Sequence, residues 1–290
     1  MGQTMQIRKA ERKKAKLRLG ISGASGSGKT WSALEIATGM GGKIGMIDTE
    51  SGRGELYGND FQYDIIRLEA PYSPDRYIEA IKTFEKSGYD IVIIDSLSHA
   101  WTGEGGVLSI VEKNGGQFQN GWKVGTPKQN ALVDALINSK MHILITLRVK
   151  SEYVVEKNEK GKNEPRKIGL SPVQRDGLEY EFTVFMDIDN QQHIAHITKD
   201  NTKLFDQQYI KPSKEMGIQL MEWLNNGVDM RERFVNVLLP WAIIQLNNCQ
   251  SLAELKEQFS TFYNQYNLEF PSEMEVFIAA KDKKKEELSK

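Results

Sequence analysis

The sequence predicts an α/β fold, in which a mostly parallel sheet flanked by helices spans residues 17–210 and a small helical module follows over residues 211–290. The first observation behind this prediction is a glycine-rich loop at residues 23–30, which lies between an apolar strand pattern and a helical pattern. The second is the run from Tyr89 to Ser96, whose consecutive β-branched apolar residues are typical of a buried parallel strand. Strand patterns stop at Pro212, and only helical patterns follow.

Strand and helix patterns alternate along the core. Further strands are expected at residues 43–48, 64–68, 141–146, 182–189 and 194–198. Helices are expected at residues 31–40, 75–87 and 128–140 in the core, and at residues 213–225, 231–245, 251–266 and 271–288 in the tail. Pro240 is expected to kink the second tail helix, because proline lacks a backbone N–H. Asn225 to Gly227 is expected to act as a hinge.

The composition is that of a soluble globular protein, and the sequence excludes a disulfide-stabilised protein and a membrane-spanning protein. Of 290 residues, 39% are hydrophobic and 27% charged, and the mean hydropathy is −0.49. Cys249 is the only cysteine, which excludes a disulfide framework. No apolar run approaches the roughly 20 residues of a membrane span, and the basic start is not followed by the apolar segment of a secretion signal. We therefore expect a cytoplasmic protein that does not enter a membrane.

Positive charge gathers at the start of the chain, although the net charge is only −1. Residues 1–20 carry seven lysines and arginines against Glu11 alone. We assign a basic N-terminal arm to residues 1–16. Two interpretations of it remain open: a solvated terminus, or an arm that contacts nucleic-acid phosphates.

The stretch from Gly23 to Thr30 matches G-x-x-x-x-G-K-[ST], the phosphate-binding loop of P-loop NTPases. Its glycines let successive backbone N–H groups converge on an anion at a helix N-terminus. Lys29 is expected to reach the β- and γ-phosphates of ATP, and the Thr30 hydroxyl to ligate Mg²⁺. A dinucleotide-binding loop is excluded, because Trp31 stands where a third glycine is needed. The expected nucleotide-binding residues are Gly23, Ala24, Ser25, Gly26, Ser27, Gly28, Lys29, Thr30 and Trp31.

Carboxylates follow two of the predicted strands. Asp95 ends the strand that begins at Tyr89, at the edge where ligands of open α/β sheets gather, so it is expected to hold Mg²⁺ as a Walker B aspartate. The next residue is Ser96, so the glutamate that many P-loop ATPases place there is missing. The carboxylate that orients the attacking water must then come from another strand end. Glu50 is the candidate, and Asp48 is its rival.

Three motifs resemble those of the RecA-like ATPase core over residues 17–200: the phosphate loop, Ile47-Asp-Thr-Glu50 and Ile93-Ile-Asp-Ser96. In particular, the chain resembles small RecA-like ATPases of bacteriophages, some of which act in recombination by annealing single strands. The resemblance implies that Glu50 activates the hydrolytic water and that Thr146 senses the γ-phosphate. The family's glutamine beside this sensor is replaced, and Arg148 is the candidate for an electrostatic sensor in its place. The resemblance also implies a homo-oligomer, as a ring or a filament, in the cytoplasm of a bacterial host.

Two segments are candidates for contact with single-stranded DNA. Residues 96–127 contain seven glycines and the aromatic residues Trp101, Phe118 and Trp122. By position they resemble the first DNA-contacting loop of RecA-like recombinases, and bases stack on aromatic rings without sequence preference. The alternative, that the aromatic rings fill the core, stays equally open. Residues 150–176 have the pattern of a β-hairpin with a polar tip and a net charge of +2, and by position they resemble the second loop. A merely solvated hairpin is the alternative.

Oligomeric P-loop ATPases commonly donate a cation to a neighbour's ATP, and Arg175 and Lys167 are the candidates here. The helical tail is expected to serve packing or protein docking, with phage replication or recombination proteins as partners. Its third helix opens with a capping box, Ser251 followed by Glu254.

Three functions are compatible with these patterns. The leading hypothesis is a DNA-dependent ATPase of RecA type that binds single-stranded DNA and assists annealing or strand exchange. The second is a P-loop motor or loader that acts on a protein partner in DNA replication or packaging. A small-molecule kinase is disfavoured, because such kinases usually need neither a glycine- and aromatic-rich segment nor a basic hairpin.

Overall fold

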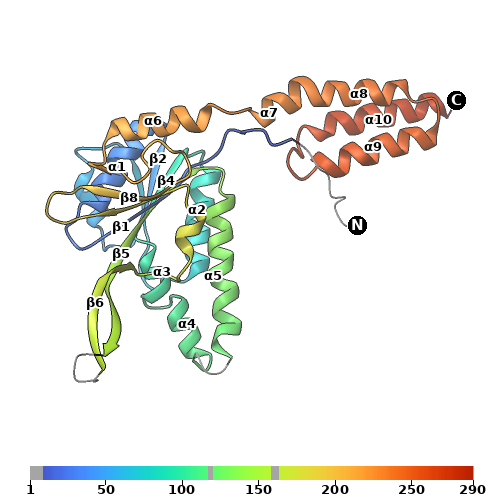
Figure 1. Cartoon of the computed structure of the whole chain (residues 1–290). Helices are drawn as coiled ribbons and strands as arrows, with labels where there is room; N and C mark the ends of the chain where they lie inside the picture. The colour runs from blue at the N-terminus through green and yellow to red at the C-terminus, as the bar shows by residue number, and fades with distance from the viewer. Residues whose placement is uncertain (1–8, 117–119, 158–162, 290) are drawn as a thin grey trace. The chain divides into compact units, whose positions relative to one another are not determined.

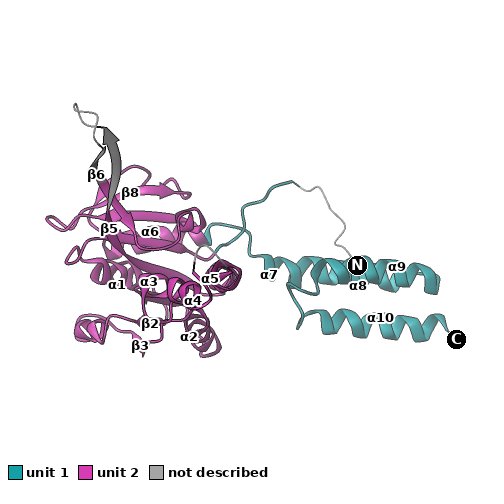
Figure 2. Cartoon of the chain, turned by 90° about the horizontal axis from the view of Figure 1, so that it is seen from below, with its two compact units in different colours: residues 1–15, 225–290 teal, residues 16–224 magenta. Residues whose placement is uncertain are grey.

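The computed structural model describes residues 9–116, 120–157 and 163–289, with side chains described outside residues 152–168. Contacts divide the chain into two compact units, one of residues 16–224 and one of residues 1–15 together with 225–290 (Figure 2). The boundary at residue 225 coincides with the predicted hinge.

The larger unit is built on a single mixed sheet. Its strand order is β3-β2-β4-β5-β1-β7-β8-β9, with β6 paired to β5. The strands are β1 (Arg18–Gly23), β2 (Ile44–Asp48), β3 (Asp64–Arg67), β4 (Ile91–Asp95), β5 (His142–Lys157), β6 (Asn163–Pro172), β7 (Val184–Ile188), β8 (Ala195–Asp200) and β9 (Tyr209–Ile210). The six strands from β3 to β7 in this order run parallel, and β8 and β9 add antiparallel pairs at one side. The predicted mostly parallel sheet is confirmed.

The strand order brings the predicted site to one edge of the sheet. Strand β5 lies between β1 and β4, so a β5 residue that lies level with the carboxyl ends of these two strands can reach both of them. In register, Gly23 of β1 lies beside Arg148 of β5, and Asp95 of β4 lies beside Asp48 of β2. Because parallel strands share a carboxyl edge, the chain following each strand starts from the same place.

Helices cover both faces of this sheet (Figure 1). Helix α1 (Lys29–Met40) and helix α6 (Lys214–Asn225) bury apolar side chains against one face. Helix α2 (Pro74–Lys86) and helix α5 (Gly121–Asn138) pack on the other. The helices flanking the sheet are therefore also confirmed.

Helix α6 belongs to the core, although the sequence analysis assigned it to the C-terminal module. Its buried Met216, Leu220 and Leu224 join the same apolar cluster as α1. Two glycines permit the close approach: a Cβ at Gly217 would collide with the backbone of α1, and one at Gly39 would collide with the backbone at the start of α6. The contacts therefore end the core at residue 224 and not at 210.

Residues 96–127 are largely helical, although their glycines suggested a loop. They contain α3 (Ser98–Thr102), α4 (Val107–Lys113) and the first turns of α5. The helix predicted from residue 128 begins at Gly121 and includes Pro127. Tight helix packing explains the glycines, since a Cβ at Gly121 or Gly125 would collide with Val111 of α4.

The predicted hairpin is present and is continuous with the core. Strand β5 is a single strand of 16 residues, and its second half pairs with β6 from Val149↔Pro172 to Lys157↔Asn163. Figure 1 shows the β5–β6 pair extending beyond the rest of the sheet. The core strand and the hairpin, which the sequence suggested as separate elements, are thus one piece of backbone.

The smaller unit is a helical bundle. Its helices are α7 (Met230–Arg233), a π-helical turn η3 (Phe234–Leu238), α8 (Leu239–Asn248), α9 (Leu252–Tyr266) and α10 (Met274–Leu288). The predicted irregularity near Pro240 is the π-helical turn just before it. The predicted cap is present as well, because Ser251 Oγ accepts from the Glu254 N–H at 3.2 Å.

Part of the basic N-terminal arm pairs with this bundle. The Lys14 N–H donates to the Val228 carbonyl at 3.1 Å, and the Val228 N–H donates to the Arg12 carbonyl at 2.9 Å. Lys14 Nζ also lies 3.1 Å from the Asp229 carboxylate. These contacts hold residues 12–14 against the bundle, while residues 1–8 lie outside the described part of the chain.

In the part of the chain that the structure describes, no helix has the length and apolar character needed to span a membrane.

The contact between α1 and α6 gives a stability prediction. Gly217→Ala should lower the free energy of unfolding by about 1–3 kcal/mol, because the new methyl group must displace packed backbone. Gly169→Ala is the control, since a Cβ there would meet nothing within 4 Å. Denaturant unfolding of the two variants checks this, and equal stabilities would contradict the close packing of α6.

Candidate nucleotide site

The phosphate loop joins β1 to α1 and forms one wall of a cavity of about 470 Å³. Gly26 and Gly28 adopt φ values of 77° and 86°, which is the left-handed region that favours glycine. The cavity is lined by Gly23, Ser25, Gly26, Gly28, Lys29, Thr30, Glu50, Arg53, Leu56, Tyr57, Asp95, Arg148 and Val149. Its walls therefore combine the start of a helix, two carboxylates and three cations.

Lys29 lies over the loop from which it originates. Its Nζ donates to the carbonyls of Gly23 and Ala24, both at 2.9 Å. Burial lowers the pKa of Lys29, and the nearby Asp95 and Glu50 carboxylates oppose that shift. Phosphate oxygens would replace the neutral carbonyls with charged acceptors, which form stronger hydrogen bonds.

Asp95 is the buried centre of the site. Thr30 Oγ1 donates to its Oδ2 at 2.5 Å, and Thr146 Oγ1 donates to its Oδ1 at 2.5 Å. Burial raises the pKa of Asp95, and the two hydroxyl donors only partly offset this. Each carboxylate oxygen is therefore tied to a different element, α1 or β5.

The donors at this point fit Mg²⁺. A hydroxyl and a carboxylate are hard oxygen ligands, and magnesium in nucleotide sites typically takes one or two carboxylates with phosphate oxygens and water. Among the described residues, no group of three or more His, Cys, Asp or Glu could hold a metal. Thr30 and Asp95 therefore suit an ion that arrives with a nucleotide.

Glu50 lies in the cavity, where it forms an ion pair with Arg148. Arg148 Nε donates to Glu50 Oε1 at 2.9 Å, and Arg148 Nη2 donates to Oε2. Ser96 Oγ donates to Oε1 at 3.1 Å. Burial raises the pKa of Glu50, but the hydrogen bonds and charge of Arg148 outweigh burial and hold it below its usual value. The ion pair makes Glu50 a weaker base.

Asp48, the rival to Glu50, lies outside the cavity. Its side chain is fully buried, and its Oδ1 accepts from the Glu50 N–H at 2.7 Å. Its Oδ2 has no hydrogen-bond partner among the described residues. Asp48 therefore shapes the backbone that presents Glu50, and its own side chain does not face the nucleotide.

His99 supports the same strand end from α3. Its Nδ1 lies 2.8 Å from Thr49 Oγ1, and its ring stacks on Tyr72 with centroids 4.8 Å apart. Thr49 Oγ1 donates in turn to the Ser96 carbonyl at 3.1 Å. His99 is thus a polar neighbour of the site.

Five of the predicted site residues do not line the cavity: Ala24, Ser27, Trp31, Thr146 and Arg175. Ser27 is fully buried, and its hydroxyl lacks a partner among the described groups. Trp31 is 42% exposed and packs edge-on against Phe61, with ring centroids 4.8 Å apart. Thr146 acts through Asp95, as described above.

The sequence analysis missed one wall of the cavity. Arg53, Leu56 and Tyr57 belong to a short 3-10 helix, η1 (Arg53–Tyr57), which follows Glu50 closely. An aromatic ring and an aliphatic side chain suit a planar heterocycle, and the Arg53 guanidinium can stack on such a ring or pair with a phosphate. The signal in the sequence that could have identified these residues was their position just after Glu50, the proposed base.

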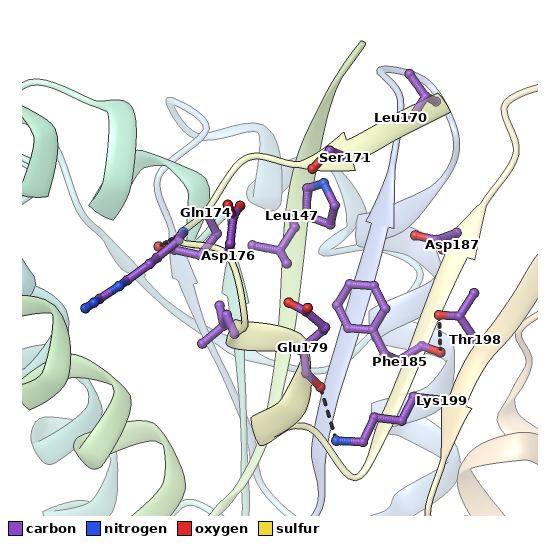
Figure 3. A pocket seen from close by; sticks show the side chains of 13 residues that line it. Leu147, Leu170, Ser171, Gln174, Asp176, Glu179, Phe185, Asp187, Thr198 and Lys199 are labelled. Carbon is purple, nitrogen blue, oxygen red and sulfur yellow. Dashed lines mark hydrogen bonds between the residues drawn. The ribbon is translucent and has the colours of Figure 1, made fainter. Parts of the chain in front are cut away.

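Arg175 lies away from its own nucleotide cavity. Its Nη1 is 3.3 Å from Asn130 Oδ1. It lines a separate cavity of about 390 Å³, whose charged side chains of both signs include Asp176, Glu179, Asp187 and Lys199 (Figure 3). The mixed charge gives that cavity no clear preference for an anion. The Lys167 side chain lies outside the described residues, so the trans-acting cation stays a prediction.

Comparison with known proteins agrees with the fold and the cavity. A family model described as an AAA domain matches residues 15–215, which is more than half of the chain. No curated protein matches the chain. The predicted P-loop ATPase is thereby confirmed, while the narrower likeness to phage recombination proteins stays a prediction. The chain belongs to the AAA-domain family of P-loop ATPases.

Proposed function

We propose that this ATPase binds single-stranded DNA and assists recombination, by annealing or strand exchange, as an oligomer. The observation that carries this proposal is another cavity, of about 490 Å³, lined by two tryptophans, two cations and the Asp176 carboxylate, which we call the second cavity. Strand β5 contributes Arg148 and Val149 to the nucleotide cavity and Lys150 to this one. Nucleotide hydrolysis and strand binding would then share one framework.

At the nucleotide cavity, each residue has a separate task. Lys29 and the loop N–H groups bind the phosphates of ATP. Magnesium held by Thr30 and Asp95 would neutralise phosphate charge as the terminal bond breaks. Glu50 accepts a proton from the attacking water. For this, Arg148 must first release the Glu50 carboxylate. Arg148 lines the same cavity, so the γ-phosphate offers it an alternative anionic partner.

The second cavity suits an unpaired base. Trp101 of α3 and Trp122 of α5 lie with ring centroids 5.9 Å apart and are each half-buried. Lys150 of β5 and Arg175 line the same cavity. A base stacked on the indoles and phosphates beside the cations is the combination used by proteins that bind single strands without sequence preference. Phe118, the third aromatic candidate, lies outside the described residues.

The β5–β6 hairpin extends this surface. Lys150 lies at its base, and residues 150–176 carry seven lysines and arginines against five carboxylates. A net charge of +2 on a protruding hairpin favours a phosphate backbone. Arg175 is our candidate for contact with a neighbouring subunit's ATP, which leaves ring and filament arrangements both open.

A second candidate function, action on a protein partner, has one specific observation in its favour. Val237, Trp241 and Ile244 are 57%, 56% and 54% exposed and follow one another at helical spacing along η3 and α8. Such an apolar stripe on a helical bundle is typical of a protein-docking surface. In this alternative the ATPase responds to the partner and not to DNA.

The two functions predict different responses. With single-stranded DNA, the first predicts stimulated ATP hydrolysis and a binding constant that falls with salt at a slope of about −0.7 per phosphate contacted. Trp122→Ala should weaken binding by about 5- to 150-fold with little change in slope, because one stacked base is worth about 1–3 kcal/mol. Trp241→Ala is the matched control and should bind DNA normally. Unstimulated hydrolysis with a flat salt dependence would favour the protein-directed alternative.

The two carboxylates near the β2 end can be separated by experiment. Glu50→Gln should leave ATP and Mg²⁺ binding nearly intact while slowing hydrolysis by roughly 10²–10⁴-fold, the usual contribution of a positioned general base. Asp48→Asn, which keeps an acceptor for the Glu50 N–H, should hydrolyse ATP within a few-fold of the wild type. Steady-state hydrolysis and equilibrium nucleotide binding measure both. Normal turnover in Glu50→Gln with loss in Asp48→Asn would reverse the assignment.

A further inference from the structure

The turn between β7 and β8 touches the phosphate loop from outside the nucleotide cavity. His193 Nδ1 lies 3.0 Å from the Ser27 carbonyl oxygen, a contact between residues 166 positions apart. A carbonyl can only accept, so Nδ1 carries the hydrogen and donates. His193 is not among the side chains that line the cavity, whereas Gly28, the residue after Ser27, is.

Because of the geometry of the peptide bond, this contact also fixes the direction of the Gly28 N–H. The Ser27–Gly28 peptide is not among the cis bonds, so its carbonyl and its N–H point in opposite directions. His193, which engages the carbonyl, lies outside the cavity lining, so the Gly28 N–H points away from His193. Gly28 adopts a φ of 86° immediately before α1 begins at Lys29. Backbone N–H groups at such a position are the ones that bind phosphate.

The turn is built to hold His193 in place. Its φ of 57° is in the left-handed region, which is uncommon for a residue with a side chain. Asp189 stabilises this turn: its Oδ1 accepts from the N–H groups of Gln191 and Gln192, and its Oδ2 accepts from that of Ile194, at 2.7–2.8 Å. These backbone hydrogen bonds lower the pKa of Asp189. The carboxylate thus fixes the backbone on both sides of the histidine.

We propose that His193 is a positioning residue for nucleotide binding, whose Nδ1–H fixes the Ser27–Gly28 peptide so that the Gly28 N–H faces the phosphates. This inference rests on nucleotide binding at the phosphate loop. It assigns His193 no contact with the nucleotide and no part in proton transfer. Losing its hydrogen bond should therefore weaken phosphate binding in the ground state and the transition state alike, which raises KM and leaves kcat unchanged.

The test compares His193→Gly with His193→Asn. Glycine keeps the left-handed backbone and removes the donor, whereas asparagine tolerates the same backbone and supplies an amide N–H. Binding of a fluorescent ATP analogue with Mg²⁺, and steady-state hydrolysis, are measured for both. His193→Gly should raise Kd and KM by about 3- to 10-fold, the value of one neutral hydrogen bond. His193→Asn should recover most of that loss.

Gln207→Gly is the matched control, because Gln207 also has a left-handed φ, of 59°. It separates the effect of a new glycine at such a position from the loss of the His193 donor, and should leave Kd unchanged. If His193→Gly fails to fold, His193→Asp takes its place, since aspartate tolerates this backbone but offers only acceptors. It should bind the analogue more weakly than His193→Asn.

The outcomes are distinct. Wild-type affinity in His193→Gly, or equal loss in the glycine and asparagine variants, would overturn the role of the donor. A fall in kcat at unchanged KM would overturn the positioning role as well. Failure of the wild-type protein to bind the analogue would instead reject the nucleotide site itself, so failure of this inference and of the proposed function can be told apart.

Discussion

The site depends on one buried carboxylate that is shared between two hydroxyl groups. Asp95 ends β4, and its two oxygens accept from Thr30 at the start of α1 and from Thr146 within β5. Since β5 lies between β1 and β4, the start of α1 after β1, the end of β4 and Thr146 of β5 meet at this edge of the sheet. Burying an ionised carboxylate costs stability, and the two donors recover only part of that cost. The arrangement therefore favours a bound cation.

Around Asp95, the loop and the base are each held by contacts from distant parts of the chain. Arg148 engages Glu50 from within β5, and Arg148 N donates to Ser98 Oγ of α3 at 2.9 Å. Helix α3 also carries His99 toward the nucleotide site and Trp101 toward the second cavity. His193 contacts the phosphate loop from the turn between β7 and β8, and β7 pairs with β1 on the side away from β5. Helix α3 and strand β5 thus contact both the nucleotide site and the second cavity, which makes a coupling between them physically reasonable.

Local motifs predicted the parts of the site that depend on backbone continuity. A strand, a glycine-rich turn and a helix in sequence fix the phosphate loop, and a buried strand that ends in an acid fixes Asp95. Contacts across the fold could not be predicted in this way: the Arg148–Glu50 pair joins residues 98 positions apart, and the His193–Ser27 contact joins residues 166 apart. Glycine residues were interpreted wrongly in two places. Gly121 and Gly125 suggested a loop, yet they permit tight packing of α4 on α5, and Gly217 permits α6 to join the core.

The most direct test of the central role of Asp95 is the magnesium dependence of ATP binding by Asp95→Asn. Asparagine keeps the size, an acceptor oxygen for one hydroxyl and an amide N–H for the other, but removes the charge, so Mg²⁺ should no longer tighten ATP binding by about tenfold or more. The melting temperature at neutral pH should not fall. Burial raises the pKa of Asp95, so the stability that this carboxyl contributes is full below its unfolded pKa and is lost as the pH rises through its folded pKa. Unchanged magnesium dependence in a folded variant would contradict this account.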